Sequence, residues 1–229
     1  MNPWWWWAPA AFGAAAAFVD GITPDPIYID YGMNVIYEDE TVYVDHQPVP
    51  FDQYADPIVE LAVNIDQPPP PMPPPAESPP AESAPTEPSP QPQSAAAPAP
   101  AEEWLPLGVF ALAQEERGDP TMFFQISVNR AGVIIGAYSN SIAADQRPIA
   151  GQVDKASQRV AWRIGENSAT IFETSLANLT QDVSPVAVHF GKTTQTWLLV
   201  RMPEPAASGQ PQKLLEPPTS PPPLKTMKG

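Results

Sequence analysis

Hydrophobic and polar positions alternate with a period of two along most of the chain from residue 102 to residue 202, as expected for half-buried β-strands. Eight runs of six to nine residues are rich in β-branched and aromatic side chains, and turn residues separate them. The predicted strands are Leu105–Leu112, Thr121–Asn129, Gly132–Ser139, Arg147–Asp154, Gln158–Ile164, Ala169–Leu176, Pro185–Phe190 and Gln195–Met202. The short connections between them favour a meander of sequential antiparallel strands.

The alternation also divides each strand into an apolar face and a mixed face. The apolar positions are Met122, Phe124, Ile126 and Val128, then Val160, Trp162 and Ile164, then Val186, Val188 and Phe190. Eight such strands can close into a small barrel, and closure removes the unpaired sheet edges. We therefore predict a mainly β protein with a C-terminal eight-stranded antiparallel up-and-down barrel, and a two-sheet sandwich as the alternative.

A second alternating segment, residues 22–66, predicts a small β-meander followed by a helix. The expected strands lie at Ile27–Tyr31, Val35–Tyr37 and Val42–Val44, with turns at Gly32, residues 38–40 and residues 45–47. The helix is expected from Asp52 to Val63, where Pro57 should bend it or delay its start. A segment of this length buries little apolar surface alone, so it needs cover from a neighbouring element.

The first 21 residues are rich in tryptophan and alanine and contain no Lys or Arg. The missing basic residues argue against a secretory signal, and the interrupted apolar run is short for a membrane span. We expect this segment to be buried against its neighbours. The alternative is contact of Trp4, Trp5, Trp6 and Trp7 with a membrane surface.

Most of the 34 prolines of the chain are concentrated in two segments, of which the first, residues 67–101, contains almost no large apolar residue. Residues 67–101 are predicted to be a disordered acidic linker, because they cannot bury a core, and the composition of residues 203–229 predicts a disordered tail. The expected organisation therefore has five parts: 1–21, 22–66, 67–101, 102–202 and 203–229.

Charge is distributed unevenly along the chain, which has a formal net charge of −15. The first Lys or Arg is Arg117, and 18 acidic residues precede it. This acidic front half would be repelled by nucleic acid, so we expect no nucleic-acid partner. The chain has no cysteine, which excludes disulfides, zinc–thiolate sites and cysteine nucleophiles.

Several stretches resemble an uncharacterised bacterial family labelled mu-protocadherin-like cell-surface proteins. They are YIDYGMNVIYEDETVYVDHQPV, EEWLPLGVFAL, GDPTMFFQISVNRAGVIIGAYSNS, GQVDKASQRVAW and HFGKTTQTWLLVR. The resemblance implies a location in the cell envelope or on the cell surface, and no known activity; a cytoplasmic location is the alternative. Members of that family begin further upstream with a secretion signal, so we expect that Met1 is not the natural start.

A shorter resemblance is to avidin-like and calycin β-barrels, carried by GVIIGAYSN, IAGQVD, QRVAWRIG, SATIFE and TQTWLLV in that order. It implies a pocket for a small ligand lined by Tyr138, Asn140, Trp162, Ser168, Thr170 and Trp197. The chain departs from that family because Pro185–Phe190 is an extra strand, and no strand follows TQTWLLV to supply the expected Asp. The alternative interpretation is that these aromatic residues fill the barrel core.

Candidate catalytic groups are few, since His46 and His189 are the two histidines. His46 lies in a predicted turn, and His189 should point away from the face of Val188 and Phe190. The sequence contains no HExxH, GxSxG, P-loop or GxGxxG motif, and we assign no catalytic residue, metal ligand or cofactor. The prediction is a non-catalytic structural or interaction protein of the cell surface, whose partner is an envelope protein or polysaccharide. A small-ligand-binding barrel is the first alternative and a hydrolase the second.

Overall fold

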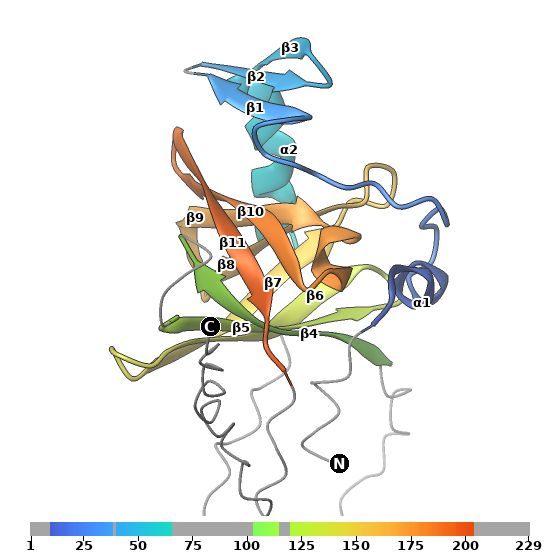
Figure 1. Ribbon diagram of the computed structural model, residues 1–229, viewed down its shortest axis with the longest axis vertical. Helices are drawn as coiled ribbons and strands as arrows, with labels where there is room; N and C mark the ends of the chain where they lie inside the picture. Colours follow the sequence, from blue (N-terminus) through green and yellow to red (C-terminus); the bar gives the residue numbers. More distant parts are fainter. Residues whose placement is uncertain (1–9, 39, 66–102, 115–119, 204–229) are drawn as a thin grey trace, which may run out of the picture.

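The computed structural model describes residues 10–38, 40–65, 103–114 and 120–203, and its C-terminal part is a closed antiparallel barrel of eight strands (Figure 1). The strands are β4 (Trp104–Ala113), β5 (Met122–Asn129), β6 (Val133–Asn140), β7 (Asp145–Val153), β8 (Arg159–Ile164), β9 (Asn167–Ser175), β10 (Val183–Phe190) and β11 (Thr193–Arg201). Each strand pairs with the next along the chain, and β11 pairs with β4 to complete the ring. The predicted up-and-down barrel is confirmed, and the sandwich alternative is wrong. The two proline-rich segments and Trp4–Trp7 lie outside the described residues, except for Pro203 at the end of the last range.

The barrel interior is filled by the side chains of the predicted apolar face. Phe124, Trp162 and Phe172 form its centre, with ring centroids 5.0 Å apart for Phe124–Phe172, 5.6 Å for Trp162–Phe172 and 5.7 Å for Phe124–Trp162. Phe124 and Trp162 are fully buried. Phe190 departs from the pattern because it lies at the end of β10, where its side chain is 41% exposed.

Arg201, on the last strand, contacts several elements at one end of the barrel. Its guanidinium donates to the carbonyl oxygens of Leu107 and Leu179, each at 2.8 Å. Leu179 belongs to the short 3-10 helix η2 (Asn178–Thr180), which lies between β9 and β10. The guanidinium also lies 4.8 Å from the ring centroid of Phe110 on β4. One side chain thus joins the first strand, the last strand and η2.

The segment before the barrel contains a three-stranded sheet formed by β1 (Val35–Glu38), β2 (Thr41–Val44) and β3 (Gln47–Pro50). The meander is present, but the prediction of a strand at Ile27–Tyr31 is wrong. The backbone N–H of Ile27 donates to the side chain of Gln158, and that of Ile29 donates to the side chain of Asn178. These backbone groups therefore bond to side chains and not to a neighbouring strand. The third strand is β3, whose prolines are tolerated because it lies at the sheet edge.

Helix α2 (Phe51–Val63) follows β3 directly and lies close to the predicted bounds. Pro57 does not delay its start, since the helix begins six residues earlier at Phe51. We call residues 27–65 the N-terminal layer, because this segment covers the outer face of β8, β9 and β10 (Figure 1). Its buried side chains, among them Ile58 and Val42, form one cluster with Ala161, Ile171 and Ala187 of the barrel. Residues 27–65 and the barrel are therefore in direct contact.

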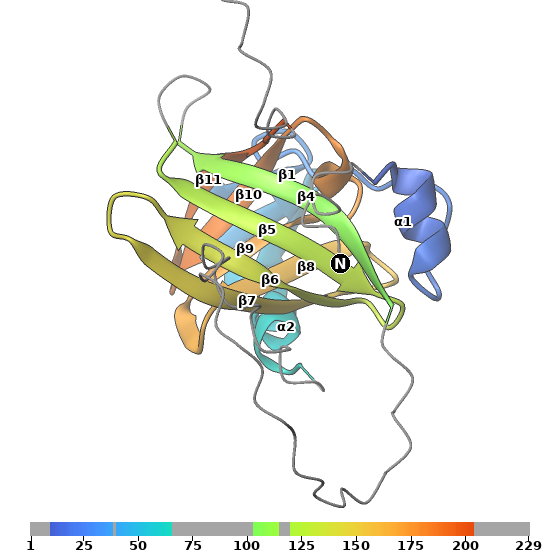
Figure 2. The same ribbon diagram turned by 90° about the horizontal axis from the view of Figure 1, so that it is seen from below.

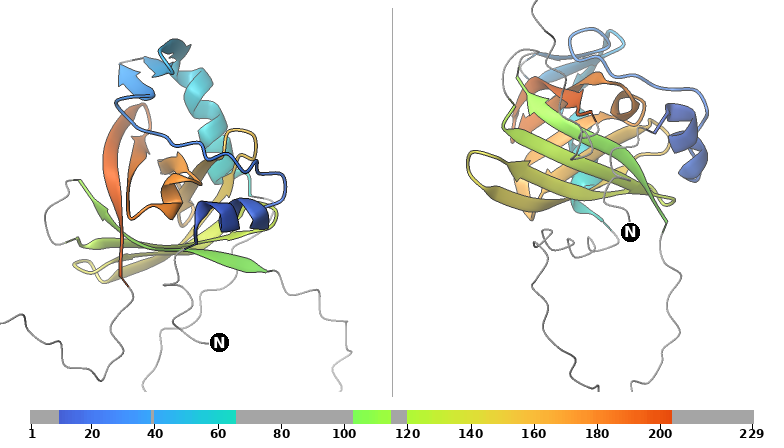
Figure 3. Two further views of the ribbon diagram at one scale, coloured as in Figure 1. Left: turned by 45° about the vertical axis from the view of Figure 1, so that its right-hand side comes forward. Right: turned by 60° about the horizontal axis from the view of Figure 1, so that its bottom comes forward.

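Helix α1 (Phe12–Phe18) lies against a different part of the barrel (Figure 2). Ala15 and Val19 belong to the same buried cluster as the barrel core, and the N–H of Asp20 donates to the carbonyl of Arg130 at 2.9 Å. Figure 3 shows α1 beside β4, well away from the three-stranded sheet. The described part of the opening segment is thus partly buried, as expected, but it covers the barrel rather than the meander.

Candidate functional site

The most unusual group in the described chain is the carboxylate of Glu173, which is fully buried on the outer face of β9. The neighbouring side chains of Phe172 and Thr174 point into the barrel, so the side chain of Glu173 points out of it. The N-terminal layer covers this position and removes it from water. A buried carboxylate is costly unless it is paired and hydrogen-bonded, so its partners define a candidate site.

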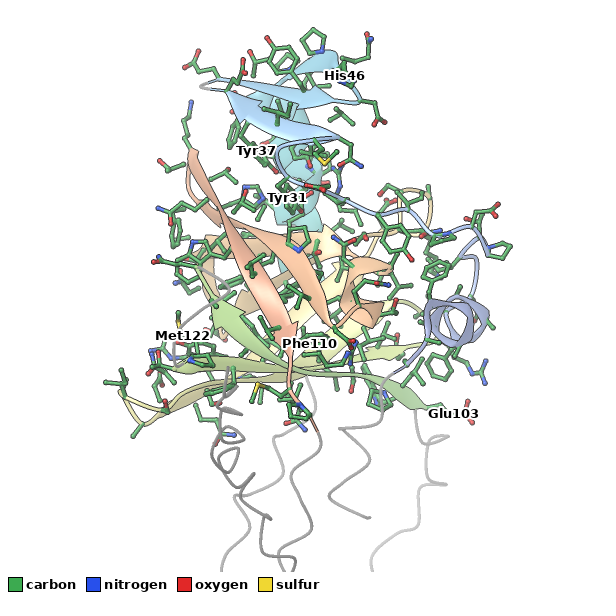
Figure 4. The ribbon with its side chains drawn as sticks, viewed as in Figure 1. Tyr31, Tyr37, His46, Glu103, Phe110 and Met122 are labelled. Atoms are coloured by element: carbon green, nitrogen blue, oxygen red, sulfur yellow. The ribbon has the colours of Figure 1, made fainter. Side chains whose placement is uncertain are left out.

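Three tyrosines of the N-terminal layer meet Glu173. The hydroxyl of Tyr54 donates to Oε1 at 2.8 Å, and that of Tyr37 donates to Oε2 at 3.0 Å. The hydroxyl of Tyr31 donates to the backbone carbonyl of Glu173 at 2.8 Å. Figure 4 labels Tyr31 and Tyr37 between the three-stranded sheet and the barrel. These three bonds join the layer to a single residue of β9.

Two basic side chains of the barrel complete the cluster. His189 on β10 places Nε2 at 2.9 Å from Oε2 of Glu173, and Arg159 on β8 places Nε at 3.1 Å from Oε1. The carboxylate oxygens only accept, so we assign the hydrogen on Nε2 to this bond. The other imidazole nitrogen, Nδ1, lies 2.9 Å from the hydroxyl oxygen of Thr194. His189 is thereby held on both sides.

The electrostatics of this Glu173 cluster keep its hydroxyls protonated. Burial first, and then the charge of Glu173, raise the pKa of Tyr31, Tyr37 and Tyr54 well above the ordinary value. Burial alone would lower the pKa of Arg159, but Glu173 and the three tyrosines of the cluster together outweigh it, and the pKa is raised. All three tyrosines are therefore neutral hydrogen-bond donors, and Arg159 is a cation.

The series Thr194, His189 and Glu173 has the order hydroxyl, imidazole and carboxylate that nucleophilic catalysis uses. The surroundings differ from those of a reaction site. His189 is only 5% exposed, and Tyr37 covers its ring edge-on at a centroid distance of 5.8 Å. Neither of the two clefts described below is lined by a member of this series. The arrangement favours a structural connection between layer and barrel.

A cleft of about 450 Å³ opens beside the cluster, between α2 and the hairpin of β7 and β8. Its lining residues are Pro57, Ile58, Glu60, Leu61 and Asn64 from the helix side, and Gln152, Asp154, Ser157 and Arg159 from the hairpin side. Arg159 belongs to both the cleft and the Glu173 cluster, so the buried network fixes one wall of the cleft. A smaller cleft of about 190 Å³ is lined by Glu40, Pro50, Phe51, Asp52 and Lys192.

The six residues of the predicted ligand pocket differ in environment. Tyr138 and Trp162 are buried and both contact Phe124, at centroid distances of 5.5 Å and 5.7 Å. Thr170 and Trp197 are half-buried, and Ser168 is exposed.

Two of these six side chains are held by near neighbours in the sequence. Asn140 accepts from the N–H groups of Ile142 and Ala143, and its amide donates to the Tyr138 hydroxyl at 3.4 Å. The Trp197 indole donates to Gln195. Trp162 keeps a buried indole N–H without a hydrogen-bond partner among the described residues.

Sequence reasoning missed the Glu173 cluster, although two signals were present. Glu173 is a charged residue directly after the apolar pair Ile171 and Phe172, and Tyr31 and Tyr37 place polar tips on otherwise apolar positions. The prediction for His189 is confirmed, because its side chain points away from Val188 and onto Glu173. His46 lies in the turn between β2 and β3, where it is exposed, as expected (Figure 4).

Comparison with protein-family models, with curated proteins and with solved structures finds no match to this chain. The fold and the cluster define its class as a closed eight-stranded up-and-down barrel with an N-terminal layer clamped to its outer face. Within the described ranges no group of three His, Asp or Glu side chains is arranged to hold a metal ion. Neither described helix has the length and apolarity to cross a membrane.

Proposed function

We propose that this protein is a non-catalytic interaction module of the bacterial cell envelope or cell surface. The barrel serves as a rigid scaffold, and the N-terminal layer is a fixed part of the surface that it presents. The observation that carries this proposal is the Glu173 cluster. Its ionisable groups bind one another across the contact between layer and barrel, so they are engaged in holding that surface together.

The filled interior of the barrel supports a binding function on its outer surface. Phe124, Trp162 and Phe172 are in mutual contact at the barrel centre, as in a packed protein core. A partner would therefore meet the outer surface and its clefts. The location rests on the sequence resemblance described above, and an envelope protein or polysaccharide is the class of partner that this location offers.

The experiment that tests the location is cell fractionation of a bacterium that expresses the natural gene from its own start. Recovery with the envelope, together with antibody labelling of intact cells, is the expected result. Recovery with the soluble cytoplasmic proteins would contradict it.

The non-catalytic part of the proposal is tested with purified protein. We expect no turnover of model esters, phosphate esters or glycosides by the wild-type chain. A hydrolytic activity that disappears in both Thr194→Val and His189→Gln would overturn the proposal and favour the hydrolase alternative.

A second candidate function, a small-ligand-binding barrel, is favoured by the unpartnered indole of Trp162. A buried N–H without a partner costs free energy, and a ligand acceptor atom inside the barrel would remove this cost. The test is a thermal-shift screen of a metabolite panel that includes biotin. A stabilising ligand whose effect disappears in Trp162→Phe would support this function, and no shift across the panel would exclude it for those ligands.

A further inference from the structure

The cleft between α2 and the β7–β8 hairpin presents polar groups on both sides of an apolar strip. Pro57, Ile58 and Leu61 supply the apolar part from the helix. Glu60 lies on the same helix and Asn64 follows its last residue, and Gln152 and Asp154 lie on the hairpin side of the cleft. A volume of about 450 Å³ is in the range of small-ligand sites.

The hairpin side of the cleft is held in place by its own hydrogen bonds. Oδ1 of Asp154 accepts from the N–H groups of Ala156 and Ser157 and from the Ser157 hydroxyl, at 3.1, 2.7 and 2.8 Å. Arg159 is fixed from behind by Glu173, at 3.1 Å from its Nε. The wall is thus formed before any ligand arrives, which lowers the entropy cost of binding.

Other polar atoms of the cleft are available for a ligand. The side-chain amides of Asn64 and Gln152, Oδ2 of Asp154 and the terminal nitrogens of Arg159 have no hydrogen-bond partner in the described ranges. This set contains both donors and acceptors, and it lies on both walls. A ligand that only donates or only accepts would leave half of these groups unmatched.

The charges in and behind the cleft exclude the simplest ionic ligands. The lining contains two negative charges, on Glu60 and Asp154, and one positive charge, on Arg159. An anion would be repelled by the two carboxylates, and a cation would meet the guanidinium. A neutral molecule rich in hydroxyl groups avoids both costs, because each hydroxyl can donate and accept.

We propose that this cleft binds a neutral saccharide, with its hydroxyls on the amide, carboxylate and guanidinium groups and its C–H face on Pro57 and Leu61. The assignment rests on the proposed interaction function and names its ligand class. Gln152 and Asn64 are the residues that select for hydroxyl groups, one on each wall.

The test is NMR titration of the purified full chain with cellobiose, maltose and N,N′-diacetylchitobiose, each at millimolar concentration. We expect at least one of the three to shift backbone amides of residues 57–64 and 152–159, and not those of the distant β4–β5 pair. Gln152→Leu and Asn64→Leu should each weaken this binding about tenfold, which corresponds to the loss of one well-made hydrogen bond. Gln125→Leu is the matched control, because Gln125 is also a half-buried strand glutamine but does not line the cleft.

The proposal is overturned if none of the three disaccharides shifts these amides. It is also overturned if glutamate or lysine, titrated in parallel, shifts them while the sugars do not, or if Gln125→Leu weakens binding as much as Gln152→Leu. These results concern saccharide binding by the purified chain, whereas the envelope location is tested by the fractionation experiment. Failure of the saccharide proposal can therefore be distinguished from failure of the proposed location.

Discussion

The carboxylate of Glu173 and the imidazole of His189 lie 2.9 Å apart on the outer face of adjacent strands, although both side chains are buried. The antiparallel register of β9 and β10 fixes this distance, since Glu173 pairs with Ala187 and His189 with Ile171. The barrel therefore positions a carboxylate–imidazole pair by itself, and the N-terminal layer adds the tyrosines that seal it from water. The stability of the contact between layer and barrel should depend strongly on this one carboxylate.

Glu173→Gln should lower the free energy of unfolding by about 3–5 kcal/mol, the usual cost of removing one member of a buried charged pair. The amide cannot balance Arg159, and its NH₂ group would replace a carboxylate oxygen that accepts from Arg159 or from His189 and Tyr37. Urea denaturation followed by circular dichroism measures the change.

The matched control is Glu103→Gln, because Glu103 pairs with Arg130 at the surface, where its side chain is 65% exposed. An exposed ion pair contributes little, so this variant should unfold near the wild-type midpoint. Equal effects of the two substitutions would show that Glu173 has no special role.

The tyrosines of the cluster predict a loss of stability at high pH. The pKa values of Tyr31, Tyr37 and Tyr54 are raised in the folded chain, whereas in the unfolded chain each ionises near its ordinary value of about 10. Their contribution to stability is complete below that value, and it declines as the pH rises further because only the unfolded state releases the protons. The free energy of unfolding should therefore fall above about pH 10, and Tyr37→Phe should reduce the slope by up to about 1.4 kcal/mol per pH unit.

A stability that stays level from neutral pH to pH 11 would contradict this account. The control is Tyr43→Phe, since the Tyr43 hydroxyl has no hydrogen-bond partner in the described chain and its side chain is outside both buried clusters. This variant should retain the wild-type dependence on pH, as measured by urea denaturation at a series of alkaline pH values.

The barrel could be predicted from the sequence because each strand carries a local signal. In β5 the apolar positions from Met122 to Val128 recur every second residue, and every predicted run overlaps an observed strand. The first expected strand at Ile27–Tyr31 failed for a non-local reason, since Gln158 and Asn178 take its hydrogen bonds. Alternation alone cannot distinguish a strand from an extended segment that lies on another surface.

The Glu173 cluster could not be predicted for a similar reason. Alternation correctly places Glu173 on the outer face of its strand, where a carboxylate would ordinarily meet water. Its burial depends on Tyr37 and Tyr54, which are more than 100 residues away in sequence. Local patterns give the direction of each side chain, but not which distant segment covers it.

The centre of the barrel predicts a large effect of core truncation. Phe124→Ala should cost about 3–5 kcal/mol, because Phe124 is fully buried and its ring contacts Tyr138, Trp162 and Phe172. Phe190→Ala is the matched control on β10, where the side chain is 41% exposed, and it should cost much less. Thermal unfolding of the two variants compares them directly, and a small effect of Phe124→Ala would indicate a loosely packed interior.

Two strand glycines are required by close contact between neighbouring backbones. A Cβ at Gly151 would collide with the carbonyl oxygen of Ala161, and one at Gly136 with that of Gln125. Gly151→Ala should therefore displace β7 from β8 and lower the melting temperature by several degrees, as expected for about 1–3 kcal/mol of overpacking. Gly13→Ala is the control, because nothing lies within 4 Å of the added methyl group and alanine favours the helix α1. A Gly151→Ala chain as stable as the Gly13→Ala chain would contradict the close approach of these strands.

The contact between the N-terminal layer and the barrel should survive when the chain between them is cut. The contact contains a buried apolar cluster, the Glu173 bonds and the hydrogen bonds from Gln158 and Asn178, so it does not depend on the covalent connection. A protease site inserted after Ala95 tests this directly. After cleavage, the two pieces should elute together in size-exclusion chromatography. Glu173→Gln should make them separate at low concentration, whereas Glu103→Gln should not. Separation of the wild-type pieces would show that the connection, rather than the cluster, keeps the layer on the barrel.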